Sequence, residues 1–150
     1  MRIDKRAVLG TILSVVAVVA VVKAAPIILN TDTSLAVVSS WSMEPALHVG
    51  DLIVVARWGE IEVGDVIVYS DSLGRRLIVH RVVEVRTSSE GVVYVTKGDA
   101  NPMPDVMPIP QQRVKGKVVL VVPYIGVLKL VFERLVKART LGLYILLLKL

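Results

Sequence analysis

The stretch Leu77-Ile78-Val79-His80-Arg81-Val82-Val83-Glu84-Val85-Arg86 is rich in β-branched residues, and Val92-Val93-Tyr94-Val95-Thr96-Lys97 follows it closely. Valine and isoleucine favour β-strands because their branched side chains pack well on a pleated surface. The intervening residues, Thr87 to Gly91, include two serines and a glycine, which favour a turn. The two runs therefore predict a β-hairpin with a longer loop.

The same pattern continues on both sides of this hairpin, from Leu35 to Val122. Short β-branched runs separated by turn residues predict an all-β domain. The breaks contain Gly-Asp pairs, serine clusters and the proline-rich segment Asn101 to Pro110, which favour loops. The remaining predicted strands are Leu35 to Ser40, Leu52 to Arg57, Val66 to Ser70 and Val114 to Val122.

The N-terminal segment combines a basic flank with an uncharged apolar run, Ala7 to Val22. The run alone is shorter than the roughly 20 residues that span a bilayer, but continuing it through Lys23 to Leu29 gives enough length. We therefore predict that residues 1–29 form a cytoplasmic N-terminus and a transmembrane anchor, with the rest of the chain outside. Residues 30–34 are a polar spacer. A cleavable signal peptide is the alternative, which Lys23 and Pro26 disfavour because they make a poor cleavage site.

The pattern becomes helical after Pro123. Apolar residues recur at spacings of three and four, and charged residues lie beside them. The apolar set is Ile125, Leu128, Phe132 and Leu135, and the charged set is Lys129, Glu133 and Lys137. We predict that residues 124–150 form an amphipathic, membrane-associated helical segment. A second membrane span is disfavoured because each buried charge costs about 2.5 to 3.5 kcal/mol, and 141–148 is short; an ordinary core helix is the other alternative.

Composition and charge point to a membrane and away from nucleic acid. The chain is 54% apolar, which is high for a soluble protein. Residues 1–29, 30–123 and 124–150 carry net charges of +3, −2 and +4, which give the total of +5. The basic excess therefore lies in the apolar ends, where it meets anionic lipid, and the acidic middle argues against nucleic-acid binding. Cysteine is absent, which excludes disulfides and thiolate chemistry, and we expect no metal or cofactor.

A candidate nucleophile lies in Ser39-Ser40-Trp41-Ser42-Met43-Glu44-Pro45, where Ser42 follows a predicted strand and precedes a proline-enforced turn. A serine hydroxyl is a weak nucleophile unless a base activates it. The chain has two histidines. His48 is expected in an exposed turn, whereas His80 lies inside a strand that can aim it, so we favour His80 as the base.

The base needs an orienting carboxylate, and the reaction needs donors for an oxyanion. Asp99 and Asp105 both lie in the loop that follows the predicted hairpin, and the residues alone do not rank them. The backbone N–H of Ser42 and the hydroxyl of Ser40 are the candidate oxyanion donors.

Five motifs resemble, in order, the conserved boxes of type I signal peptidases, peptidase family S26. The resemblance covers Val37 to Gly126. The motifs are Ser42-Met43-Glu44-Pro45 with Leu47 and Gly50-Asp51, Gly64-Asp65-Val66-Ile67-Val68-Tyr69, His80-Arg81-Val82-Val83, Lys97-Gly98-Asp99-Ala100-Asn101 and Val122-Pro123-Tyr124-Ile125-Gly126. The bacterial branch of that family has lysine where this chain has His80. The chain is therefore similar to the archaeal and endoplasmic-reticulum branch.

The resemblance implies roles for individual residues. Ser42 is the implied nucleophile, His80 the base and Asp105 the orienting acid, with Asp99 in a supporting role. Ser40 matches an oxyanion-stabilising position of the bacterial branch. Ala100 departs from the commoner asparagine after Gly-Asp.

The resemblance also implies a function and a location. Residues 35–123 would form a signal-peptidase-like β catalytic domain that removes signal peptides after small residues at −3 and −1, by acyl-enzyme chemistry at the outer face of the cell membrane. We expect preproteins, the lipid bilayer and the protein-export channel as partners, and a substrate that adds as a strand beside an edge such as Leu35 to Ser40. The alternatives are a membrane endopeptidase of narrower specificity and a non-catalytic, membrane-tethered β module that binds extended peptides.

Overall fold

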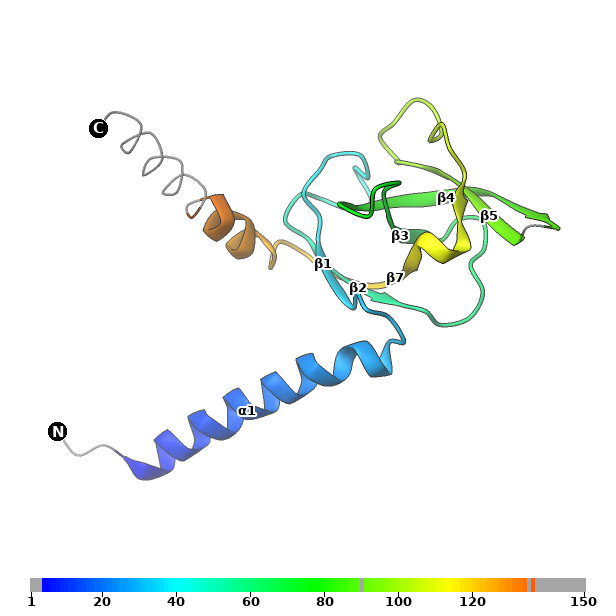
Figure 1. The fold of residues 1–150 in the computed structure, drawn as a ribbon. Coiled ribbons are helices and arrows are strands. Elements are labelled where there is room, and N and C mark those ends of the chain that lie inside the picture. Colours follow the sequence, from blue (N-terminus) through cyan, green and yellow to red (C-terminus); the bar gives the residue numbers. More distant parts are fainter. Residues whose placement is uncertain (1–3, 90, 135, 137–150) are drawn as a thin grey trace, which may run out of the picture.

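The computed structural model describes residues 4–89, 91–134 and 136, and Figure 1 shows a long N-terminal helix joined to a β-sheet. The predicted fold class, mainly β with a helix at each end, is confirmed. In chain order the elements are α1 (Lys5–Ile28), β1 (Leu35–Val37), β2 (Leu52–Ala56), β3 (Val66–Ser70), β4 (Leu77–Ser88), β5 (Gly91–Lys97), β6 (Ile109–Pro110), the 3-10 helix η1 (Gln111–Arg113) and β7 (Val114–Val122), and residues 127–134 are again helical.

The strands form an antiparallel sheet in the order β1-β2-β7-β3-β4-β5-β6. The predicted hairpin is confirmed: β4 pairs with β5 as far as Ser88 and Gly91, so its turn is tighter than the sequence indicates. The predicted first strand is too long, because β1 ends at Val37. The short strand β6, which pairs with β5, was not predicted. It lies at the edge of the sheet, where a proline such as Pro110 is tolerated.

Strand β3 lies in the middle of the sheet, and both of its faces are covered. Ile67, Val68 and Tyr69 are all at most 2% exposed. Successive side chains of a strand point to opposite faces, so these residues divide between two apolar clusters. One cluster contains Val38, Met43, Leu47, Ile53, Val55 and Val68. The other contains Ile67, Tyr69, Val82, Tyr94, Ile109 and Val114.

Helix α1 projects away from the sheet (Figure 1). Its 24 residues rise about 36 Å at 1.5 Å per residue, and none of them is buried. Asp4 caps the helix by accepting a hydrogen bond from the N–H of Arg6. Among the described residues, α1 is the one helix whose length and composition would let it cross a membrane.

The C-terminal end of α1 is attached to the sheet through hydrogen bonds. The indole N–H of Trp58 donates to the carbonyl of Ile28 at 3.1 Å. The predicted spacer, residues 30–34, lies against β7: the hydroxyl of Thr31 donates to the carbonyl of Lys115 at 2.7 Å, and the ammonium of Lys115 is 2.7 Å from Asp32. The junction between α1 and the sheet is therefore held in place.

The C-terminal helix begins at residue 127 and leaves its apolar side chains exposed. Leu128 is 81% and Phe132 68% exposed, which argues against an ordinary core helix packed on the sheet. Gly126, just before the helix, donates its N–H to the carbonyl of Gly50 at 2.8 Å. Leu135 and residues 137–150 of the predicted amphipathic segment, with the apolar run 141–148, lie outside the described residues.

Candidate active site

Ser42 lies in a turn that connects β1 and β2. Met43 and Leu47, in the same turn, are 0% and 3% exposed and belong to the first apolar cluster. The peptide bond between Glu44 and Pro45 is cis. Because Met43 and Leu47 are fixed in the core, Ser42 is held half-buried at the surface.

The loop that follows β5 holds the backbone of Ser42 from the other side. The N–H of Ala100 donates to the carbonyl of Ser42 at 2.9 Å. A Cβ atom on Gly98 would lie 2.6 Å from the same carbonyl oxygen, which is too close. Glycine at position 98 therefore allows the loop to approach Ser42.

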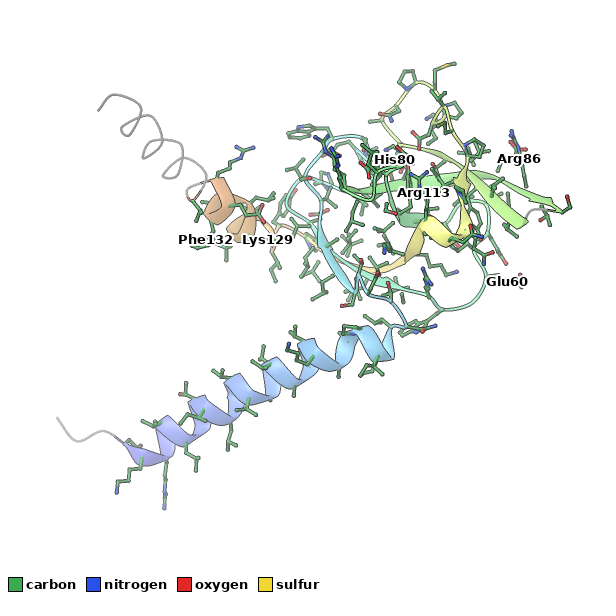
Figure 2. All side chains as sticks on the ribbon, viewed as in Figure 1. Glu60, His80, Arg86, Arg113, Lys129 and Phe132 are labelled. Carbon is green, nitrogen blue, oxygen red and sulfur yellow. The ribbon has the colours of Figure 1, made fainter. Side chains whose placement is uncertain are left out.

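His80, which Figure 2 labels, lies on β4. Its two ring nitrogens connect Ser42 with Asp105. Its side chain is 10% exposed. Nε2 is 3.2 Å from the Ser42 hydroxyl oxygen, and Nδ1 is 2.6 Å from Asp105 Oδ2. Because the carboxylate accepts, Nδ1 carries the proton and Nε2 is free to accept from the serine hydroxyl.

Asp105 is held by donors from two further strands. Its Oδ2 accepts hydrogen bonds from the hydroxyls of Tyr69, at 2.9 Å, and Thr96, at 2.6 Å. Burial raises the pKa of Asp105, but the hydrogen bonds from His80, Thr96 and Tyr69 outweigh it, so the pKa lies below the usual value. The carboxylate is therefore ionised near neutral pH and able to stabilise a positive charge on His80.

Asp99 binds the neighbour of His80 along the chain. The guanidinium of Arg81 donates to the two oxygens of Asp99 at 2.9 and 2.7 Å, and to the carbonyl of Gly64 at 2.8 Å. The hydrogen bond to Asp99 raises the pKa of Arg81. This bidentate pair connects β4 to the loop that holds Ser42.

Ser40 and His48 occupy different places around the turn. The Ser40 hydroxyl oxygen is 3.3 Å from that of Ser42. His48 is 3.3 Å from Glu44 and 3.7 Å from Asp51 instead, and its side chain is 47% exposed. Of the two histidines, it is His80 that hydrogen-bonds Ser42.

A cleft of about 300 Å³ opens beside Ser42 and His80. It is lined by residues 36–40, by residues 76–80 and by the core residues Ile53 and Val68. A larger cleft of about 390 Å³, between residues 56–61 and Tyr94, includes none of the predicted site residues. We favour the smaller cleft as the binding site because it adjoins the hydrogen-bonded group.

In the structure Ser42, His80 and Asp105 thus form one hydrogen-bonded chain, and Asp99 accepts hydrogen bonds from Arg81 instead. The contacts of Arg81, Tyr69 and Thr96 in the site were not predicted. Arg81 directly follows His80, which is a weak signal. Tyrosine and threonine are common in any strand, so nothing in the sequence distinguishes Tyr69 or Thr96.

Comparisons with known proteins match the same part of the chain. A family model described as "Signal peptidase, peptidase S26" matches residues 9–88, more than half of the chain. The match includes Ser42 and His80 and ends before Asp99 and Asp105.

The chain is also similar to the signal peptidase complex catalytic subunit SEC11 of several eukaryotes. The Yarrowia lipolytica protein is 39% identical over 85 residues, which cover 56% of this chain and 49% of the relative. The Schizophyllum commune protein is 33% identical over 125 residues, covering 67% and 65%. Human SEC11C is 37% identical over 83 residues, covering 53% and 43%. The chain thus matches about half the length of the first relatives. Because the family model matches more than half of the chain, the chain belongs to the signal peptidase family, peptidase S26.

Proposed function

We propose that this chain is a membrane-anchored serine endopeptidase that removes signal peptides from secreted preproteins. The observation that carries the proposal is the hydrogen-bonded chain from Ser42 through His80 to Asp105, beside an open cleft. Membership of the signal peptidase family supports the substrate class. Cleavage after small residues at −3 and −1 is part of the proposal.

The proposed reaction proceeds through an acyl-enzyme. His80 takes the proton of Ser42 as Oγ attacks the scissile carbonyl, and Asp105 stabilises the resulting imidazolium. The imidazolium then gives its proton to the leaving amine as the peptide bond breaks. Water, deprotonated by His80, releases the acyl group and restores the serine. The Ser42 N–H and the Ser40 hydroxyl, whose oxygen is 3.3 Å from Ser42 Oγ, would stabilise the oxyanion.

The cleft supports binding of an extended peptide. Residues 36–40 and 76–80 line it, and both lead toward the Ser42 and His80 pair. Strand β1 is at the end of the sheet order, so its outer edge can accept another strand. A signal peptide would then lie along the cleft, with its small residues next to Ser42.

The proposed location follows from α1. This helix would cross the cell membrane once, and the basic residues before and at its start, such as Lys5 and Arg6, would keep the N-terminus in the cytoplasm. Residues 35–123 would act as the catalytic domain outside, and 124–150 would associate with the bilayer. Preproteins, lipid and the protein-export channel are the proposed partners.

The proposal is tested with the full chain, purified in detergent or vesicles, and a panel of preproteins. We expect one cut in each, identified by the N-terminal sequence of the product, and loss of cleavage when the −1 residue is replaced by a large one. Cleavage of a single preprotein would indicate the narrower endopeptidase. Binding of extended peptides without any cut would indicate the non-catalytic module.

Changing Gly98 to alanine tests whether the loop after β5 positions the nucleophile. The added Cβ would lie 2.6 Å from the Ser42 carbonyl oxygen, so the loop and the serine must move apart. We expect preprotein cleavage to fall by about tenfold or more, since a small displacement of reacting groups is costly. Gly10→Ala is the control, because its Cβ would meet nothing within 4 Å. Equal activity of both variants would contradict the positioning role.

A further inference from the structure

We propose that the buried hydroxyls of Tyr69 and Thr96 are a positioning pair that holds Asp105 against His80. The inference rests on the proposed function, because it concerns how the orienting acid of that reaction is kept in place. Neither residue lines the cleft beside Ser42. They are therefore positioning residues. Thr96 acts on the reaction through Asp105, whereas the Tyr69 hydroxyl lies 2.9 Å from Asp105 Oδ2 and also 3.4 Å from His80 Nδ1.

Three donors converge on one oxygen of Asp105. His80 Nδ1 is 2.6 Å, Thr96 Oγ1 2.6 Å and the Tyr69 hydroxyl 2.9 Å from Oδ2. Thr96 Oγ1 is also 3.4 Å from the Tyr69 oxygen, but its single hydrogen is committed to the nearer carboxylate. Hydrogen bonds to an ionised carboxylate are stronger than neutral ones, so the carboxylate is fixed in one orientation.

The pair is rigid because of where the sheet puts it. Thr96 is 0% and Tyr69 2% exposed. Strand β4, which carries His80, lies between β3 and β5, which carry Tyr69 and Thr96. Three adjacent strands therefore deliver the three donors to Asp105. Burial also raises the pKa of Tyr69 well above its usual value, so its hydroxyl keeps the proton that it donates.

Around Asp105 the loop makes few apolar contacts. The flanking apolar side chains are open to solvent: Met103 is 72% and Val106 97% exposed. The backbone N–H of Asp105 donates to the carbonyl of Thr96 at 2.8 Å, which fixes the main chain. The side chain itself is 23% exposed, so without the hydroxyls it could rotate away from His80 into water.

The experiment compares Thr96→Val with Thr96→Ser in the full chain, with preprotein cleavage as the readout. Valine keeps the shape but removes the hydroxyl. Serine keeps the hydroxyl. We expect Thr96→Val to lower kcat by about tenfold, as fits loss of a hydrogen bond to a charged group. KM should be unchanged, and Thr96→Ser should stay near the wild-type rate. Tyr69→Phe should act in the same way as Thr96→Val.

Two controls separate positioning from folding. Thr87→Val and Tyr94→Phe make the same chemical changes away from Asp105, and should leave kcat unchanged. In an Asp105→Ala background, Thr96→Val should have no further effect on kcat, because the group that Thr96 positions is gone. Thermal unfolding of each variant tells whether a loss of rate follows a loss of folded protein.

Equal kcat for Thr96→Val, Thr96→Ser and wild type would overturn the inference, as would an effect of Thr96→Val that persists unchanged in the Asp105→Ala background. A rise in KM alone would also overturn it. These results differ from failure of the proposed function, in which the wild type cuts no preprotein. In that case the variants can still be compared by the distance of Asp105 from His80 in a crystal structure, where Thr96→Val should show the carboxylate turned away and Thr96→Ser should not.

Discussion

We expect replacement of Ser42 with alanine to abolish preprotein cleavage, with a loss of at least about 10³-fold. The reason is that the Ser42 hydroxyl oxygen is 3.2 Å from His80 Nε2 and is the nucleophile of the proposed reaction. Alanine removes the attacking atom and changes little else, since Ser42 is half-buried in a turn that Met43 and Leu47 fix in the core. The measurement is the rate of product formation by the purified full chain.

The matched control for this change is Ser72→Ala. Ser72 lies in the exposed turn between β3 and β4 and is not among the residues that line the cleft. The Ser72→Ala variant should cleave preproteins at the wild-type rate. If Ser42→Ala still cut at a rate near that of the wild type, Ser42 would not be the nucleophile, and a contaminating peptidase or a different residue would have to account for the activity.

Replacing His80 with alanine gives the second large effect, because it removes the base and breaks the connection from Ser42 to Asp105. We expect a loss of about 10³-fold or more in kcat. The histidine that serves as its control is His48, which contacts Glu44 and Asp51 instead. His48→Ala should stay active. Loss of cleavage in His48→Ala but not in His80→Ala would reverse the assignment.

A lysine at position 80 distinguishes this site from the serine and lysine pair of the bacterial branch. A lysine base must be neutral to accept a proton. Here Asp105, whose pKa lies below the usual value because its hydrogen bonds outweigh its burial, would hold the ammonium in its charged form. We therefore expect His80→Lys to be as inactive as His80→Ala. Substantial activity would mean that Asp105 does not control the charge at this position.

The sequence predicted the central strands well and the edges poorly. The bounds of β3 and β7 agree with the prediction because both strands are rich in β-branched residues and are bordered by turn or loop residues. The end of β1 was wrong because Ser39 and Ser40 leave the sheet to form the wall of the cleft. Strand β6 was missed because two residues, one of them proline, carry no periodic signal.

The site was only partly predictable for a different reason. Because the chain has two histidines and His80 lies on a rigid strand, the residues alone favour His80 as the base, and the structure places it in hydrogen-bond contact with Ser42. The residues alone do not decide between Asp99 and Asp105, because spacing along a proline-rich loop does not tell which side chain turns toward the sheet. In the structure Asp105 hydrogen-bonds His80 and Asp99 hydrogen-bonds Arg81.

The central claim, that His80 activates Ser42 for acyl transfer, is tested most directly by covalent labelling. The full chain is incubated with a serine-directed peptidyl phosphonate, and the modified residue is identified by mass spectrometry. We expect a single adduct on Ser42, none in Ser42→Ala, and labelling slowed by about 10²-fold or more in His80→Ala, as for loss of a general base. An adduct on another residue, or labelling of Ser42 at the same rate with and without His80, would contradict the claim.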